Sequence, residues 1–169
     1  SDVCFIGTWE PEREVWLRHI ADKLPHISLV IWGNMWLENC SHPGLKKCVR
    51  GNAVYNQEMA KAFKSSKIVL NFIRTQNMFS HTMRTMEVPA SNAFLLTQRS
   101  IEQAEKLFKE GTGIACFENY DELISKILFY LDHEDQRKQI TTNSNQMVKA
   151  YTLKKQLKSY FEHCPINNV

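Results

Sequence analysis

Residues 68–73 read Ile-Val-Leu-Asn-Phe-Ile, and this run indicates the fold class. Apart from Asn71, branched and aromatic side chains fill it, without the alternation of apolar and polar residues that marks a strand with one face in water. Such a run is typical of a strand that is buried on both faces of a parallel sheet. Residues 3–6 and 28–32 have the same character, and each run is followed directly by a glycine.

Helical segments alternate with these strands along the chain. The apolar spacing predicts helices over residues 12–23, 56–64, 81–88, 101–108 and from 119 onward, and further short strands over 47–50, 93–96 and 114–117. Residues 34–48 and 75–79 lack periodicity and are predicted to be loops, and the helix from residue 81 is expected to end at Pro89. This order predicts an α/β, Rossmann-like three-layer domain, with a parallel sheet of about six strands.

The length of 169 residues predicts a single domain. We divide it into an α/β core over residues 1–133 and a long C-terminal helical segment over residues 134–164. In the helix over residues 12–23, Val15, Trp16 and Ile20 are expected on one buried face. Since the chain opens directly on a strand, we expect a domain excised from a longer protein.

Composition excludes several classes of protein. Hydrophobic residues make up 43% and charged residues 23%, which is typical of a globular domain and not of a disordered chain. The net charge of +3 is too small to indicate nucleic acid or a membrane surface as a partner. Residues 51–100, however, carry six basic and two acidic side chains, a local charge of +4. This excess indicates either a local anion site or ordinary solvated lysines.

The cysteines and the hydropathy pattern indicate the cellular compartment of the protein. Five cysteines without a CxxC pair exclude a zinc-binding pattern and favour reduced thiols, so we predict a cytoplasmic protein. No apolar run approaches the length of about 18 residues that a transmembrane segment needs. No resident metal or cofactor is expected.

In open parallel sheets, ligands bind at the carboxyl ends of the strands. This rule selects the residues that follow the predicted strands, which are 7–9, 33–34, 51–52, 74–80 and 97–98 and include Gly7, Gly33, Gly51 and Arg74. The most informative segment runs from Asn71 to Arg74 and then from Ser80 to Ala90; it includes residues 80–87, Ser-His-Thr-Met-Arg-Thr-Met-Glu. Neither a GxGxxG nor a Walker sequence is present. The start of the helix near residue 81 suits a diphosphate, with Arg84 as a bidentate phosphate ligand and Glu87 as an acceptor for a ribose diol. The alternative is an ordinary surface pair between Arg84 and Glu87.

The order and spacing of several pieces carry a family resemblance. They are the segments over residues 5–9, 31–33, 50–51, 59–71, 80–87, 94–97, 120–123 and 130–133. From residue 3 to about residue 152, the chain resembles the C-terminal domain of GT-B glycosyltransferases. Within these it is most similar to the bacterial group typified by the spore-maturation-protein glycosyltransferases.

This resemblance implies a domain that binds the nucleoside-diphosphate part of a sugar donor. Glu87 matches the second glutamate of the E-x7-E motif, which holds the ribose, and Gly51 matches a glycine beside the base. Two loops are implied to meet the diphosphate and the sugar; their residues are Gly7 and Thr8, and Ser80, His81 and Thr82.

Two positions depart from the family pattern. The first glutamate of E-x7-E, which usually contacts the donor sugar, falls on Phe79. Many retaining relatives have an arginine after the first-strand glycine, where this chain has Thr8 and only Arg13 nearby. We hypothesise that Arg74 and Arg84 supply the missing positive charge.

Other candidates have two interpretations each. His81 is either a phosphate donor or acid, and thus the one candidate catalytic residue, or a solvent-facing side chain. Of the four tryptophans, Trp16 and Trp32 are expected in the core, and Trp9 and Trp36 are the better candidates for stacking on a base. The lysines of the last helix either contact a partner domain or keep a solvated face; they are Lys149, Lys154, Lys155 and Lys158.

Two functions follow as hypotheses. The first is the donor-binding half of a glycosyltransferase of hexosyltransferase type, whose acceptor site and base lie in an N-terminal domain of the same full-length chain. The second is a non-catalytic Rossmann-like nucleotide-binding or assembly module, which Phe79 favours.

Overall fold

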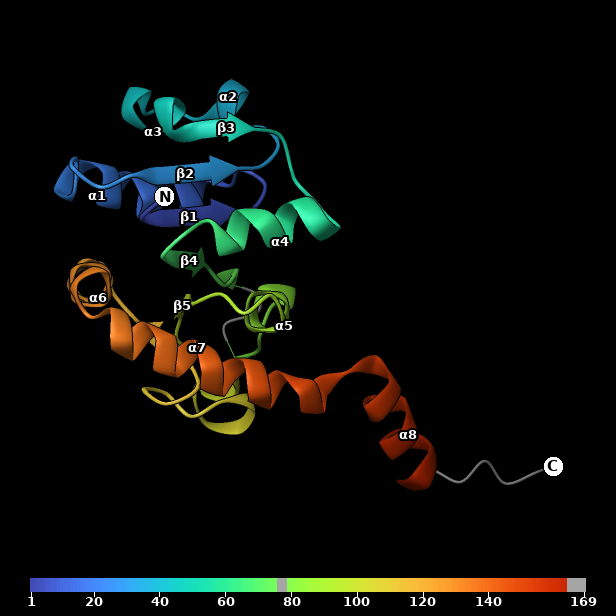
Figure 1. Ribbon diagram of the computed structural model, residues 1–169. Helices are drawn as coiled ribbons and strands as arrows, with labels where there is room; N and C mark the ends of the chain where they lie inside the picture. Colours follow the sequence, from blue (N-terminus) through green and yellow to red (C-terminus); the bar gives the residue numbers. More distant parts are fainter. Residues whose placement is uncertain (76–78, 164–169) are drawn as a thin grey trace.

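Six parallel strands form one sheet in the computed structural model, which describes residues 1–75 and 79–163. The strands are β1 (Val3–Ile6), β2 (Leu29–Trp32), β3 (Val49–Gly51), β4 (Ile68–Asn71), β5 (Leu95–Gln98) and β6 (Ala115–Phe117). Their spatial order is β3-β2-β1-β4-β5-β6, and every neighbouring pair is parallel (Figure 1). The predicted α/β, Rossmann-like three-layer fold is confirmed.

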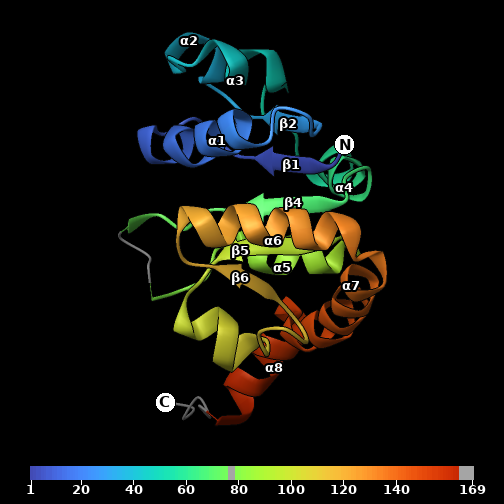
Figure 2. The ribbon, with the colours of Figure 1, turned by 90° about the vertical axis from the view of Figure 1, so that its left-hand side faces the viewer.

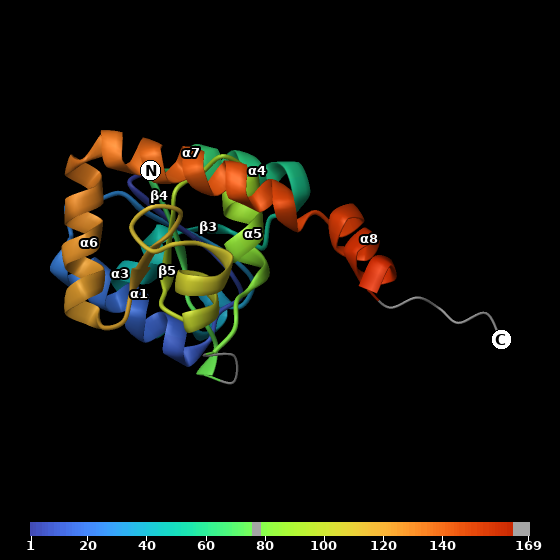
Figure 3. The ribbon, with the colours of Figure 1, turned by 90° about the horizontal axis from the view of Figure 1, so that it is seen from below.

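Helices cover both faces of this sheet. They are α1 (Pro11–Lys23), α2 (Trp36–Asn39), α3 (Pro43–Cys48), α4 (Asn56–Lys64), α5 (Met83–Ala90), the π-helix η2 (Glu102–Leu107), α6 (Tyr120–Asp132), α7 (Glu134–Val148), the 3-10 turn η3 (Lys149–Tyr151) and α8 (Leu153–His163). Helices α1 and α6 lie over one face, which faces the viewer in Figure 2. Helices α4 and α5 lie on the opposite side of the strands, as Figure 3 shows.

The strand side chains alternate between two apolar clusters. Val3 and Phe5 of β1 belong to the cluster under α1 and α6, whereas Cys4 and Ile6 belong to the cluster under α4 and α5. All four side chains are at most 4% exposed. Burying a side chain of this size contributes roughly 1.5–3 kcal/mol, so both layers of helices are needed to hold the strand.

The predicted loop over residues 34–48 is wrong, because α2 and α3 lie there. Helices of four and six residues are too short to show a helical period in the sequence. Pro43 occupies the first turn of α3, and the His42 side chain caps this helix by accepting a hydrogen bond from the backbone of Leu45. Trp36 is fully buried in the core, so its proposed role as a base-stacking ring is also wrong.

Three smaller expectations change. Val15 is 52% exposed, because α1 turns Leu17, Ile20 and Glu14 inward instead. Pro89 lies inside α5, in its last turn, and the helix ends one residue later, so the proline coincides with the end of the helix instead of preceding it. The predicted helix over residues 101–108 is the π-helix η2. The predicted loop over residues 75–79 falls largely outside the described residues.

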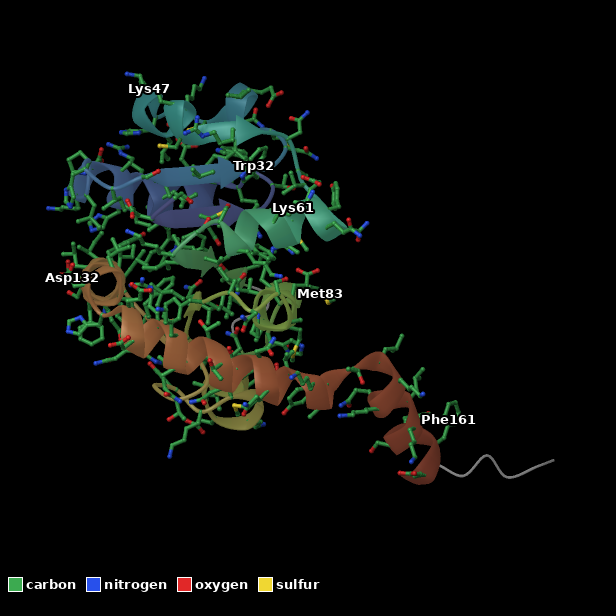
Figure 4. The ribbon with its side chains drawn as sticks, viewed as in Figure 1. Trp32, Lys47, Lys61, Met83, Asp132 and Phe161 are labelled. Carbon is green, nitrogen blue, oxygen red and sulfur yellow. The ribbon has the colours of Figure 1, made fainter. Side chains whose placement is uncertain are left out.

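The C-terminal segment is helical, as predicted. Helix α7 packs along the domain, and α8 extends away from the sheet (Figures 1 and 3). The apolar side chains of α8 are solvent-exposed, including Leu153 at 75% and Phe161 at 53%, the latter labelled in Figure 4. Within the described residues, no helix has the length and apolar character that a membrane crossing requires.

Glu14 ties α1 to the segment between α2 and α3. Its carboxylate accepts hydrogen bonds from the indole Nε1 of Trp9 (2.6 Å), the backbone N–H of Ser41 (2.8 Å) and the hydroxyl of Ser41 (2.7 Å). Burial would raise the pKa of this carboxyl, but the hydrogen bonds outweigh burial and hold the pKa at about 2. The charged form of Glu14 therefore stabilises the fold.

We expect Glu14→Gln to remove this contribution. The pKa of this carboxyl is about 2 in the folded chain and about 4.5 in the unfolded chain. The difference stabilises the folded chain by about 3 kcal/mol above pH 4.5, and this contribution disappears as the pH falls toward 2. Denaturant unfolding across this pH range measures it: the variant should be less stable at pH 7 and lose less stability on acidification. Glu38→Gln, at an exposed position, is the control and should behave as wild type. A wild-type pH profile for Glu14→Gln would contradict the account.

Candidate functional site

The crevice where the strand order reverses lies between β1 and β4. The chain leaves β1 toward β2 on one side, and it leaves β4 toward β5 on the other. The two departing loops leave a cavity of about 190 Å³, here called the switch-point cavity. Its lining residues are Phe5, Ile6, Gly7, Arg13, Asn71, Phe72, Thr82, Met83 and Arg84. Four predicted site residues, Gly7, Arg13, Thr82 and Arg84, therefore meet at one place.

Three predicted glycines hold neighbouring loops together. The N–H of Gly7 donates to the carbonyl of Trp32 (2.9 Å), and the N–H of Gly33 donates to the carbonyl of Gly51 (3.1 Å). A Cβ at Gly33 would lie 1.9 Å from the Gly7 oxygen, which also accepts a bond from the indole of Trp36. Gly33 is buried, so its role is to allow this close approach. Of the three glycines, only Gly7 lines the switch-point cavity.

Two arginines bring positive charge to the cavity. Arg13 donates to the carbonyl of Thr8 (2.8 Å), and Arg84 donates through Nε to the carbonyl of Ile6 (3.3 Å). Burial lowers the pKa of Arg13, with repulsion from Arg74 and Arg84 acting in the same direction. Arg13 is therefore close enough to Arg74 and to Arg84 to be repelled by each of them, and an anion bound beside Arg13 and Arg84 would offset that repulsion.

Arg84 and Glu87 form an ion pair. This is the surface-pair alternative, except that both side chains are only about a quarter exposed (24% and 28%). The Arg84 guanidinium also lies over the ring of Phe63, 5.7 Å from its centroid. The pair therefore fixes Arg84 at the cavity wall, and a ligand that binds either side chain has to compete with it.

Arg74, Thr8 and Trp9 lie outside the lining of the switch-point cavity. Arg74 pairs with Glu10 and lines a second cavity of about 250 Å³ with Trp16 and Tyr120. Thr8 is exposed at the rim of the loop after β1. Trp9 is half-buried, with its indole N–H committed to Glu14.

The segment over residues 80–82 is held by a polar network beneath it. Thr82 donates its hydroxyl to Asn71 (3.1 Å), and Asn71 in turn donates to Thr97 (2.8 Å). Thr85, in the first turn of α5, donates to the side chain of Gln103 (2.6 Å), which is fully buried. The start of α5, where the helix dipole favours an anion, opens onto the switch-point cavity at Thr82 and Met83. A capping box between Thr82 and Thr85 takes the backbone N–H groups of these two residues. Figure 4 shows Met83 projecting outward there.

The net charge of +4 over residues 51–100 is larger than the positive charge that these residues bring to the switch-point cavity. Of the six basic residues in 51–100, only Arg84 lines the switch-point cavity; Lys61 pairs with Glu58 on α4 (Figure 4), and Lys67 pairs with Asp2. Some of the acidic residues after residue 100 are paired with basic side chains. Arg99 and Lys126 bind Glu110 and Glu122.

Sequence reasoning missed the supporting residues Asn71, Glu102 and Gln103. Asn71 had a signal, since a polar side chain inside a fully apolar strand needs a buried partner. Glu102 and Gln103 had none, because they come from a helix that follows another strand. Ser80 and His81, which the sequence did single out, are bonded to Glu102. Among the described residues, no group of His, Cys, Asp and Glu is arranged to hold a metal ion.

The fold and the site define an open parallel α/β domain with an arginine-lined cavity at its switch point. The profile of the Glycosyl transferase-like family matches residues 13–162. The chain therefore belongs to the Glycosyl transferase-like family. A search of curated proteins finds no match.

Solved glycosyltransferase structures share this fold at low sequence identity. Alr3699/HepE from Anabaena, in complex with UDP, is 11% identical with a TM-score of 0.71, over 96% of this chain and 48% of that one. A glycosyltransferase from Rickettsia africae is 15% identical with a TM-score of 0.69, over 96% and 46%. TarM is 11% identical with a TM-score of 0.67, over 95% and 34%. The chain thus spans less than half the length of these proteins.

We expect Thr85→Val to destabilise the domain by about 1–3 kcal/mol. The substitution keeps the shape but leaves the buried oxygen of Gln103 without its closest donor, at 2.6 Å. Urea unfolding measures the loss, and Thr142→Val at an exposed position of α7 is the control. Equal free energies of unfolding for the two variants would show that the hydrogen bond between Thr85 and Gln103 does not stabilise the domain.

Proposed function

We propose that this chain is the donor-binding part of a GT-B glycosyltransferase, and that it binds the nucleoside-diphosphate portion of an activated sugar at the switch-point cavity. The observation that carries the proposal is the convergence of Arg13, Arg84, Gly7 and the start of α5 on one cavity between β1 and β4. A glycine loop, a helix N-terminus and guanidinium groups are the means by which proteins bind phosphates.

The structural neighbours support a nucleotide sugar as the ligand. Alr3699/HepE has been crystallised with UDP and with UDP-glucose, and a TarM variant from S. aureus with UDP. We extend this ligand class to the present chain, with UDP as the first probe. When a phosphate of the nucleotide replaces Glu87 as the partner of Arg84, the Glu87 carboxylate becomes free to accept hydrogen bonds from the ribose hydroxyls.

In the proposed reaction, the sugar leaves the diphosphate and is transferred to an acceptor. Negative charge grows on the leaving diphosphate, and Arg13, Arg84 and the N–H groups of α5 stabilise it. We propose that the acceptor site lies on an N-terminal domain of the full-length chain. This accords with the chain spanning 34–48% of the neighbours described above. Membership of the spore-maturation group and a cytoplasmic setting complete the proposal.

One observation favours a second function. Phe79 stands where the family motif has its sugar-binding glutamate, and its side chain is 85% exposed. A domain that lacks this carboxylate would bind a nucleotide without handling the sugar, as a non-catalytic nucleotide-binding or assembly module.

We expect Arg84→Ala to weaken UDP binding about 10-fold or more, because a charge-assisted contact to phosphate is lost. Isothermal titration calorimetry measures it. Arg18→Ala, which removes an exposed arginine of α1, is the matched control and should bind as wild type. Unchanged affinity in Arg84→Ala would remove Arg84 from the site.

The two functions differ in their response to the sugar. A donor-binding domain should gain more thermal stability from UDP-glucose or another UDP-sugar than from UDP, whereas a nucleotide sensor should not distinguish them. Thermal-shift measurements against a set of UDP-sugars decide between them. We also expect the isolated chain to transfer no sugar, so robust turnover without further domains would contradict the proposed division of labour.

A further inference from the structure

Glu102 makes two hydrogen bonds to the segment that leads into α5. Its Oε2 accepts from the hydroxyl of Ser80 at 2.9 Å and lies 2.8 Å from Nδ1 of His81. These contacts join residues 21 and 22 positions apart in the sequence. The three side chains are half-buried, so the contact is neither a core pair nor a solvated surface pair.

The π-helix η2 fixes the position of Glu102. The next residue, Gln103, is fully buried; its side chain accepts from Thr85 (2.6 Å) and donates to the carbonyl of Gln98 (3.1 Å). Ser100, just before η2, donates its hydroxyl to the carbonyl of Ser80 (2.7 Å). Residues on either side of Glu102 are therefore bonded to Ser80 and to Thr85, which flank the start of α5. π-Helical turns are frequent at functional sites.

The chemistry of the pair sets the tautomer of His81. The hydrogen bond with His81 is the largest effect that lowers the pKa of Glu102, so this side chain is a carboxylate at neutral pH. A carboxylate only accepts hydrogen bonds, so Nδ1 of His81 carries the proton. Nε2 takes part in no hydrogen bond within residues 1–75 and 79–163, and the side chain is 35% exposed.

We propose that Glu102 is a positioning residue that holds His81 by Nδ1–H and presents Nε2 to a phosphate oxygen of the bound donor. The proposal rests on the proposed function, since it requires a nucleotide at the adjacent Thr82 and Arg84. A ring that donates Nδ1–H to a carboxylate and Nε2–H to a phosphate is an imidazolium, and Glu102 balances its charge. Phe79 stands where the family motif has a glutamate, so this segment lacks that carboxylate. Glu102 places a carboxylate beside the same segment from a different helix.

The direct test observes the two ring nitrogens of His81 by ¹⁵N NMR, with His81→Asn identifying the signals. We expect Nδ1 to be protonated in the free chain and both nitrogens to be protonated after UDP is added. Glu102→Gln should abolish the Nδ1–H preference, because its amide can donate to Nδ1, and should weaken UDP binding about 3–10-fold. Glu105→Gln removes an equal charge at an exposed position of the same helix and should change neither.

The outcomes separate the two proposals. If wild type binds no UDP, the proposed function fails, and the role of Glu102 fails with it. If wild type binds UDP but the Nε2 signal of His81 does not respond, only the role assigned to His81 and Glu102 is overturned. The same holds if Glu102→Gln keeps both the tautomer and the affinity. The wild-type titration decides the question even if a variant does not fold.

Discussion

The hydrogen-bonded register between β1 and β4 is the constraint on which the rest of the structure depends. It pairs Val3 with Ile68 and Phe5 with Leu70, so the two strands end side by side. Because their connections then leave in opposite directions, Gly7 and Asn71 both line the switch-point cavity beyond the strand ends. Both layers of helices serve this pairing by burying the alternating side chains of β1.

Buried polar contacts turn these strand ends into a rigid support. Asn71, Thr97 and Gln103 are each at most 4% exposed, and all are hydrogen-bonded. In a low-dielectric interior each such group is costly when unpaired, so the network favours a single arrangement of the segment before α5. Arg13 and Arg84 are likewise held in place, by carbonyl groups and by Glu10 and Glu87. A nucleotide would exchange these partners for its phosphates with little reordering of the backbone.

The sequence predicts the sheet well, because runs that are apolar on both faces, such as residues 68–73 with Asn71 as the one polar residue, occur where both faces of a strand are covered. It does not predict α2 and α3, which are too short for a periodic signal, nor the exposed Val15, whose neighbours compete for the same helix face. The segment over residues 80–87 is found from the sequence, but its partner Glu102 is not. That contact is created when β5 is placed beside β4, and no local pattern encodes it.

The central claim is that a nucleoside diphosphate binds between the ends of β1 and β4. A crystal structure of this chain soaked or co-crystallised with UDP tests it most directly. The account predicts the diphosphate in the switch-point cavity, against the start of α5, with the Arg84 guanidinium moved from Glu87 to a phosphate oxygen and Arg13 on the same group. UDP bound elsewhere on the domain, or a cavity that stays empty at saturating UDP with the Arg84–Glu87 pair intact, would contradict it.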